Sequence, residues 1–144
     1  MKKLLFLSVI ALLFFACQKN DHNQKADQNR NLKFEKVVPG GCASDSANSN
    51  HVVYEEPDTA YYTVNEDTVT FFVGFNSECC LHFDSETSIS NDTIYMNLNL
   101  LDGPVCSCMC YYTYEFQFTG LTGPVYYVID VADGFWYFSG YVDI

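Results

Sequence analysis

The sequence predicts an all-β fold, a single antiparallel β-sandwich that follows a short export segment. Apolar and polar residues alternate along much of the chain after residue 31, as in strands that are buried on one face only. Residues that favour turns separate these runs, and no helical period of about 3.6 residues occurs after the first 16 residues. We expect about six to eight strands in a domain of about 110 residues, which is large enough to fold on its own.

The chain begins with a segment typical of export signals. Lys2 and Lys3 precede a mostly apolar run over residues 4–16, and Cys17 follows it. A run of about 13 residues is too short to span a bilayer, which needs roughly 20. Residues 1–16 are therefore predicted to be a secretory signal peptide.

The end of this segment, "LFFAC", resembles the lipobox of Gram-negative bacterial lipoproteins, which is cleaved before a lipid-bearing cysteine. The resemblance implies that Cys17 becomes the acylated N-terminus and that its covalent lipid anchors the protein in a membrane. Buried acyl groups contribute about 0.8 kcal/mol per CH₂, so several chains form a durable anchor. The expected location is the outer membrane or the cell surface. Plain secretory cleavage without a lipid is the alternative.

Residues 17–31 are predicted to be a flexible tether that carries the lipidated cysteine, and residues 32–144 the β-sandwich domain. Residues 18–31 are polar and rich in Gln and Asn, a composition that does not support a packed core. About 14 such residues span roughly 20 Å as a random coil, which lifts the domain off a lipid surface.

Within the domain, two segments show the strand alternation most clearly. "DTVTFFVGF" and "TIYMNLNLL" each place four apolar side chains on one face: Val69, Phe71, Val73 and Phe75; Ile94, Met96, Leu98 and Leu100. A short first strand is expected over 32–38. The pair Asp133-Gly134 indicates a two-residue hairpin. Further turns are expected at 91–92, 102–104 and 120–124.

The stretch "GLTGPVYYVIDV" resembles a pattern of immunoglobulin-like and fibronectin type III domains, in which a leucine and a turn glycine precede a tyrosine. Leu121, Gly123 and Tyr127 match this pattern. The resemblance implies an immunoglobulin-like sandwich in which the Tyr127 hydroxyl bonds back to the backbone. The run "CSCMCYY" is also similar to small, uncharacterised lipoproteins. Neither resemblance implies an activity, because domains of this shape share none.

Charge is distributed very unevenly. All seven Lys and Arg residues lie at or before Lys36. Of the 18 acidic residues, only Asp21, Asp27 and Glu35 lie in that part of the chain. The segment from Val37 therefore has a formal charge of −15. Neutralising nucleic-acid phosphates requires Lys or Arg, so nucleic acid is excluded as a partner. Anionic substrates and phosphoryl transfer lose their usual clamps for the same reason.

Once Cys17 is assigned to the lipid, six cysteines are candidates for disulfides: Cys42, Cys79, Cys80, Cys106, Cys108 and Cys110. An even number in an exported domain argues for disulfides. The last three occupy alternate positions that continue as Tyr112, Tyr114, Phe116 and Phe118, so they are expected to face the core. In "CCLHF", the same reasoning turns Cys79 inward and Cys80 outward.

Strand geometry favours disulfides over a metal site. Residues at i and i+4 of a strand lie about 13 Å apart, whereas the sulfurs of a tetrahedral zinc site lie within roughly 4 Å of one another. Each cysteine is therefore expected to bond to another segment, with Cys79 as the best core-side partner for one of the three. All 15 connectivities stay open. The alternative is a soft-metal site for copper or zinc, formed by Cys80, His82, Cys108 and Cys110.

These features predict a non-enzymatic binding or structural module at the cell envelope, stapled by disulfides and without a dissociable cofactor. His51 and His82 are the only histidines of the domain, and no Cys-x-x-Cys motif is present. The tyrosine pairs 61–62, 111–112 and 126–127 place rings on both faces of their strands. Exposed rings of this kind suit a glycan platform or a protein-binding patch, and covering the core is the simpler explanation. Soft-metal binding and glycan binding are the two alternative functions.

Overall fold

The computed structural model describes residues 31–42, 56–101, 103 and 107–143. The predicted signal peptide, Cys17 and the tether lie outside this part of the chain, as do His51 and Cys106. Within it the chain forms eight strands: β1 (Lys33–Cys42), β2 (Thr59–Asn65), β3 (Thr68–Glu78), β4 (His82–Ser90), β5 (Thr93–Leu101), β6 (Met109–Thr119), β7 (Val125–Val131) and β8 (Trp136–Val142). None of the described segments is a helix long and apolar enough to cross a bilayer.

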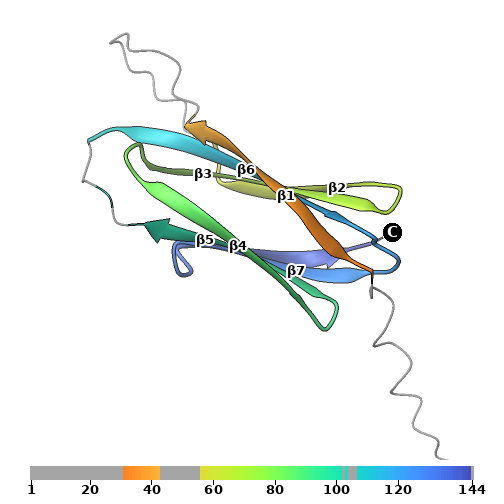
Figure 1. Cartoon of the computed structure of the whole chain (residues 1–144). Coiled ribbons are helices and arrows are strands. Elements are labelled where there is room, and N and C mark those ends of the chain that lie inside the picture. The colour runs from red at the N-terminus through yellow and green to blue at the C-terminus, as the bar shows by residue number, and fades with distance from the viewer. Residues whose placement is uncertain (1–30, 43–55, 102, 104–106, 144) are drawn as a thin grey trace, which may run out of the picture.

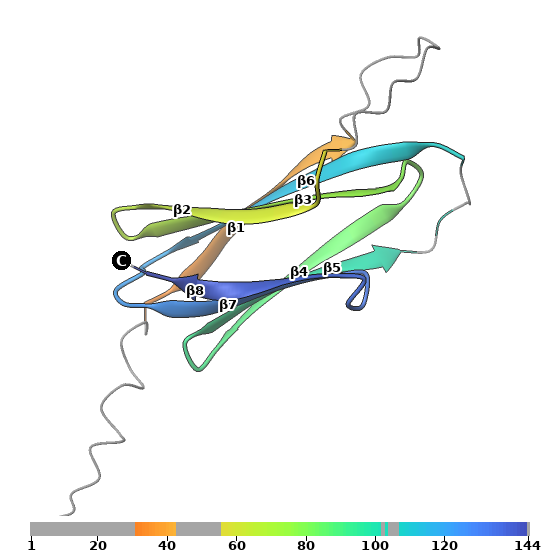
Figure 2. The same ribbon diagram turned by 180° about the vertical axis from the view of Figure 1, so that it is seen from behind.

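The strands form two four-stranded sheets that pack face to face (Figure 1). Sheet A has the order β1-β6-β3-β2, and sheet B has the order β4-β5-β7-β8; Figure 2 shows β8 at the edge of sheet B from behind. The predicted all-β sandwich is therefore confirmed. The order is not that of an immunoglobulin constant domain, in which the first two strands are neighbours, because β1 here pairs with β6.

Sheet B is mixed rather than purely antiparallel as predicted, because β5 and β7 run parallel. Parallel neighbours need a long crossover connection between them. Here β6 is that connection: the chain leaves β5, forms β6 in the opposite sheet and returns to β7. The other five strand pairs are antiparallel.

The alternation expected from the sequence places the core. On β3, Val69, Phe71, Val73 and Phe75 are fully buried, and on β5 so are Ile94, Met96 and Leu98. On β6 the inward set is Cys110, Tyr112, Tyr114, Phe116 and Phe118. Leu100 continues the inward phase of β5 but is 46% exposed, because it lies beyond the end of the packed core.

Two of the turns predicted from the sequence join antiparallel strands. Asn91 and Asp92 join β4 to β5 with φ values of 49° and 60°, the left-handed pair that a tight hairpin requires. The predicted two-residue hairpin at Asp133-Gly134 is wrong in length, because Val131 pairs with Trp136 and leaves a four-residue loop, 132–135. The N–H of Ala132 donates to the carbonyl of Leu98 on β5, 2.9 Å away, rather than across the hairpin.

The two ends of the sandwich differ. At one, which we name the closed end, the first described residues pack against Gly120, and the N–H of Leu121 donates to the carbonyl of Asp67 at 2.8 Å. At the other, the stapled end, the N–H of Cys79 in the β3–β4 connection (79–81) bonds to the carbonyl of Cys108, just before β6, and the loop 132–135 lies at the same end. The described cysteines all belong to strand ends or connections at the stapled end.

Candidate binding site at the stapled end

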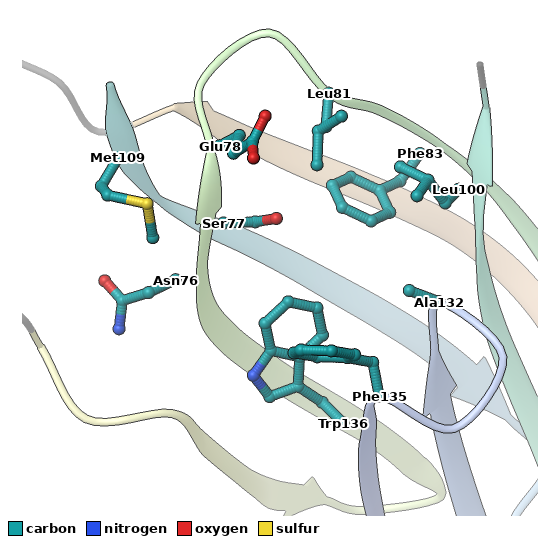
Figure 3. A pocket seen from close by; sticks show the side chains of 10 residues that line it. All are labelled: Asn76, Ser77, Glu78, Leu81, Phe83, Leu100, Met109, Ala132, Phe135 and Trp136. Carbon is teal, nitrogen blue, oxygen red and sulfur yellow. The ribbon is translucent and has the colours of Figure 1, made fainter. Parts of the chain in front are cut away.

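A pocket of about 330 Å³ opens between the two sheets at the stapled end (Figure 3). Its volume lies at the lower limit of small-molecule sites, which start at about 300 Å³. Most of its wall is apolar, with a polar edge on β3. The lining residues are Asn76, Ser77, Glu78, Leu81, Phe83, Leu100, Met109, Ala132, Phe135 and Trp136.

The hollow arises from small side chains at positions that carry large ones elsewhere. The inward positions of β3 run Val69, Phe71, Val73, Phe75 and then Ser77, a buried serine where the pattern predicts another apolar residue. Across the gap, Ala132 contributes only a methyl group. Phe83 and Leu100 continue the inward phases of β4 and β5, so they form an apolar wall without closing the space.

Phe135 and Trp136 form an aromatic pair at the pocket mouth. Their ring centroids are 4.6 Å apart, and Phe135 is 77% exposed. The indole N–H of Trp136 donates to Oδ2 of Asp58 at 2.8 Å, while Oδ1 of Asp58 accepts the backbone N–H of Asn76 at 2.9 Å. Asp58 therefore fixes the tryptophan against the edge of β3.

The loop that presents Phe135 has an unusual backbone. Ala132, Asp133 and Gly134 all have positive φ, of 53°, 55° and 88°. This conformation costs alanine about 1–2 kcal/mol and aspartate less, and strained residues of this kind gather at functional sites. Besides the bond from Ala132 to Leu98, two hydrogen bonds hold the loop: from the N–H of Gly134 to Oδ1 of Asp130 at 2.6 Å, and from the N–H of Phe135 to the carbonyl of Ala132 at 3.3 Å.

A disulfide between Cys79 and Cys108 closes the pocket end of the sandwich, with 5.6 Å between the Cα atoms. It joins the β3–β4 and β5–β6 connections, the two at this end by which the chain crosses between sheets. The N–H of Cys79 also donates to the carbonyl of Cys108 at 3.0 Å. Cys80 and Cys110 are disulfide-bonded as well. Disulfide formation is thus confirmed for these four of the six candidate cysteines, including the choice of Cys79 as partner of one of the last three.

Tyr112 reinforces this staple from within the core. Its hydroxyl lies 3.0 Å from the carbonyl oxygen of Glu78 and 2.9 Å from that of Leu81, so its single proton is shared between both ends of the β3–β4 turn. Burial raises the pKa of the Tyr112 phenol above the usual range. The hydroxyl is a neutral donor that holds the turn carrying Cys79 and Cys80.

The residues of the predicted metal site are distributed as follows. Among the described residues, the sulfurs of Cys79, Cys80 and Cys108 lie within 4.8 Å of one another. His82 is exposed on β4, and Cys110 is 3% exposed in the core. Soft-metal ligation requires thiolates, so the disulfides of this group would have to be reduced before the sulfurs could bind a metal.

Two further disulfide candidates are only partly placed. Cys42 is the last residue of β1, and its backbone pairs with Tyr112 on β6, two residues from Cys110. Cys106 lies outside the described residues.

The tyrosine pairs place rings on both faces, as predicted. Tyr127 packs inward against Phe71, 5.0 Å between ring centroids, whereas Tyr126 lies on the outer face of sheet B, 4.8 Å from Tyr141. Tyr95, Tyr137 and Tyr141 are exposed on that face. We call Tyr95, Tyr126, Tyr137 and Tyr141 the tyrosine face.

Sequence reasoning missed Asp58, Ser77 and Phe135. An aromatic residue directly after a turn signal, as in "DGFW", is a cue for an exposed ring at a loop tip. Ser77 interrupts an apolar phase and could be found in the same way. Asp58 has no local cue, because its partner Trp136 is 78 residues away.

No family model, no curated protein and no solved structure matches the chain. The proposals below therefore rest on its own residues.

Proposed function

We propose that this chain is a non-enzymatic binding module of the cell envelope, anchored by a lipid on Cys17, whose pocket at the stapled end binds an apolar group. The observation that carries the proposal is the pocket itself. It is apolar, open and of ligand size, and its walls are fixed by the Cys79–Cys108 disulfide and by the hydrogen bond between Asp58 and Trp136.

The composition of the wall favours binding over catalysis. Most lining side chains are apolar, and Asn76, Ser77 and Glu78 provide the polar edge. General acid–base catalysis commonly uses a histidine or a pair of carboxyl groups. A single carboxylate beside amide and hydroxyl groups instead suits the orientation of a bound molecule.

The position of β1 supports a role at a surface. β1 starts at the closed end, next to Gly120 and Leu121, and the pocket lies at the opposite end. A lipid anchor that precedes β1 holds the closed end towards the membrane. The pocket then faces away from the lipid, where it meets molecules from the surroundings.

Binding is tested with phenylbutanol, a neutral probe with an apolar body. Trp136 is the only tryptophan of the chain and lines the pocket, so its fluorescence reports occupancy. We expect a saturable change, weakened about tenfold or more in Phe135→Ala, because an aromatic contact of about 1–2 kcal/mol is lost. Phe34→Ala is the matched control, an exposed phenylalanine outside the pocket. A non-saturable response, or equal affinity in Phe135→Ala, contradicts the proposal.

The anchor is tested separately by fractionation. The wild-type chain, expressed with its first 16 residues in a Gram-negative host, should be recovered with membranes and carry acyl mass on Cys17. Cys17→Ser should be recovered in the soluble envelope fraction, because the covalent lipid is its only expected attachment. Equal membrane recovery of both forms would contradict the proposed lipid anchor on Cys17 and would leave the proposed binding in the pocket untouched.

The tyrosine face favours a second candidate function, glycan binding. Tyr137 and Tyr141 are exposed on β8, and Asn97 and Asp130 lie in register with Tyr137 on the same face of sheet B. Sugar rings stack on aromatic rings, and their hydroxyl groups bond to amides and carboxylates. Tyr137→Ala/Tyr141→Ala should abolish retention on immobilised neutral polysaccharides, whereas Phe34→Ala should be retained like the wild type. Absence of retention of the wild type would end this candidate.

A further inference from the structure

We infer that the ligand of the pocket carries a positive charge next to its apolar body, so that the pocket selects small apolar ammonium compounds over neutral and anionic ones. The inference rests on the proposed function, because it specifies the chemistry of the same site. Three features of the stapled end carry it: the arrangement of the walls, the charge around them, and the distribution of cations along the chain.

The walls place a carboxylate opposite aromatic rings. Glu78 lies on one side of the pocket, and Phe135 and Trp136 lie on the other, with the apolar side chains of Leu81 and Met109 beside Glu78 (Figure 3). A cation between them meets the negative faces of the rings and the carboxylate at once. Tryptophan is the strongest aromatic partner for a cation, and the attraction grows as water is removed from the site.

The side chains around the pocket add negative charge. Asp58 holds the Trp136 indole through its Oδ2, and Asp133 belongs to the loop 132–135 that carries Phe135. Burial raises the pKa of the neighbouring Tyr111 phenol, and the carboxylates of Glu56 and Asp58 raise it further, so their negative charge acts on groups at this end of sheet A. An anionic ligand would be repelled by this set.

The lysines of the described residues lie towards the other end of the sandwich. Lys36 is the last Lys or Arg of the sequence, and the described cations, Lys33 and Lys36, belong to the first half of β1, whose start lies at the closed end. His82 begins β4 with its side chain exposed. Among the described residues, the charged group that lines the pocket is the carboxylate of Glu78, so the charge there is complementary to a cation.

The test uses three probes with the same apolar body: phenylbutylammonium, phenylbutanol and phenylbutyrate. Dissociation constants are measured by Trp136 fluorescence and calorimetry on the domain with its disulfides intact. We expect the ammonium to bind about tenfold more tightly than the alcohol at low salt, and the carboxylate to bind most weakly. The gap between ammonium and alcohol should narrow as salt is raised, because the rim is partly exposed.

Substitution of Glu78 tests whether its carboxylate causes the preference for the ammonium probe. Glu78→Gln should narrow the gap between ammonium and alcohol severalfold. Glu86→Gln is the matched control, because it makes the same change in net charge on an exposed position of β4 and should keep the full gap. If Glu78→Gln does not fold, the salt dependence of the wild-type gap decides in its place.

The outcomes separate the two proposals. Equal affinities for phenylbutylammonium and phenylbutanol overturn the charge preference and leave the proposed apolar binding intact. The same holds if the difference between these affinities changes neither with salt nor in Glu78→Gln. Saturable binding by none of the three probes overturns the proposed function and this inference together.

Discussion

The closed end and the stapled end of this sandwich are held together by different interactions. The closed end buries Leu32 and Leu121 and bonds its turns to one another through the backbone. The stapled end leaves Leu100 and Phe135 exposed around a hollow. It relies instead on a disulfide, on the shared hydroxyl of Tyr112 and on the carboxylate of Asp58. Where side chains leave a hollow, covalent and polar links replace the packing that is lost.

The largest effect should follow removal of the staple. Cys79→Ala/Cys108→Ala releases a link across 29 residues that enclose β4 and β5. The free energy of unfolding should fall by about 3–4 kcal/mol, because the unfolded chain gains loop entropy. Urea unfolding of the oxidised domain measures this loss. Phenylbutanol binding should weaken as well, since the crossing segments form a wall of the pocket. A loss of less than about 1 kcal/mol would show that the other disulfides already hold this end.

A substitution at the closed end should separate stability from binding. Leu121→Ala removes a buried side chain from the closed end and should cost about 2–4 kcal/mol. Its affinity for phenylbutanol, measured well below the unfolding transition, should equal that of the wild type, because the pocket lies at the other end. A matching loss of affinity would mean that the two ends are coupled through the core and would break the comparison.

The difference between the ends also marks what the sequence could predict. Period-two alternation identified the inward residues of β3 and β6, because each strand has its own phase whatever its partner. It could not show that Leu100 is exposed, since the phase of β5 does not reveal where the opposite sheet ends. It could not show that β5 and β7 run parallel, nor that Asp58 binds Trp136, because those pairings depend on long-range topology. The site is built from such long-range pairings. The sequence therefore predicts less of the site than of the fold.

Alkaline pH should weaken the fold, and the stapled end should contribute to the loss. Burial raises the pKa values of Tyr111, Tyr112, Tyr114 and Tyr127 above the ordinary 10.0. Below that pH these phenols are protonated in both states and do not make stability depend on pH. Above it the unfolded chain loses phenol protons before the folded chain does, so the free energy of unfolding falls.

Tyr112→Phe assigns a share of this effect to the staple. At neutral pH it should cost about 1 kcal/mol, because the carbonyls of Glu78 and Leu81 lose their hydroxyl donor. Its stability should then decline less steeply above the ordinary tyrosine pKa than that of the wild type. Tyr127→Phe, nearer the closed end, serves as the comparison at a second buried phenol. An unchanged slope in Tyr112→Phe would show that this phenol ionises as readily in the folded chain as in the unfolded one.

The smallest effect concerns backbone strain at one turn from each end of the sandwich. Ala132 at the stapled end and Asn91 at the closed end both have positive φ, of 53° and 49°. Asparagine tolerates this region and alanine does not. Ala132→Gly should therefore raise the free energy of unfolding by up to about 1 kcal/mol, even though glycine adds entropy to the unfolded chain. Asn91→Gly should change it by only a few tenths of a kcal/mol. If Ala132→Gly stabilises the fold and also weakens phenylbutanol binding, the strained loop holds Phe135 in the position that binds the probe. If both glycine substitutions raise the free energy of unfolding equally, the loop stores no more strain than an ordinary hairpin.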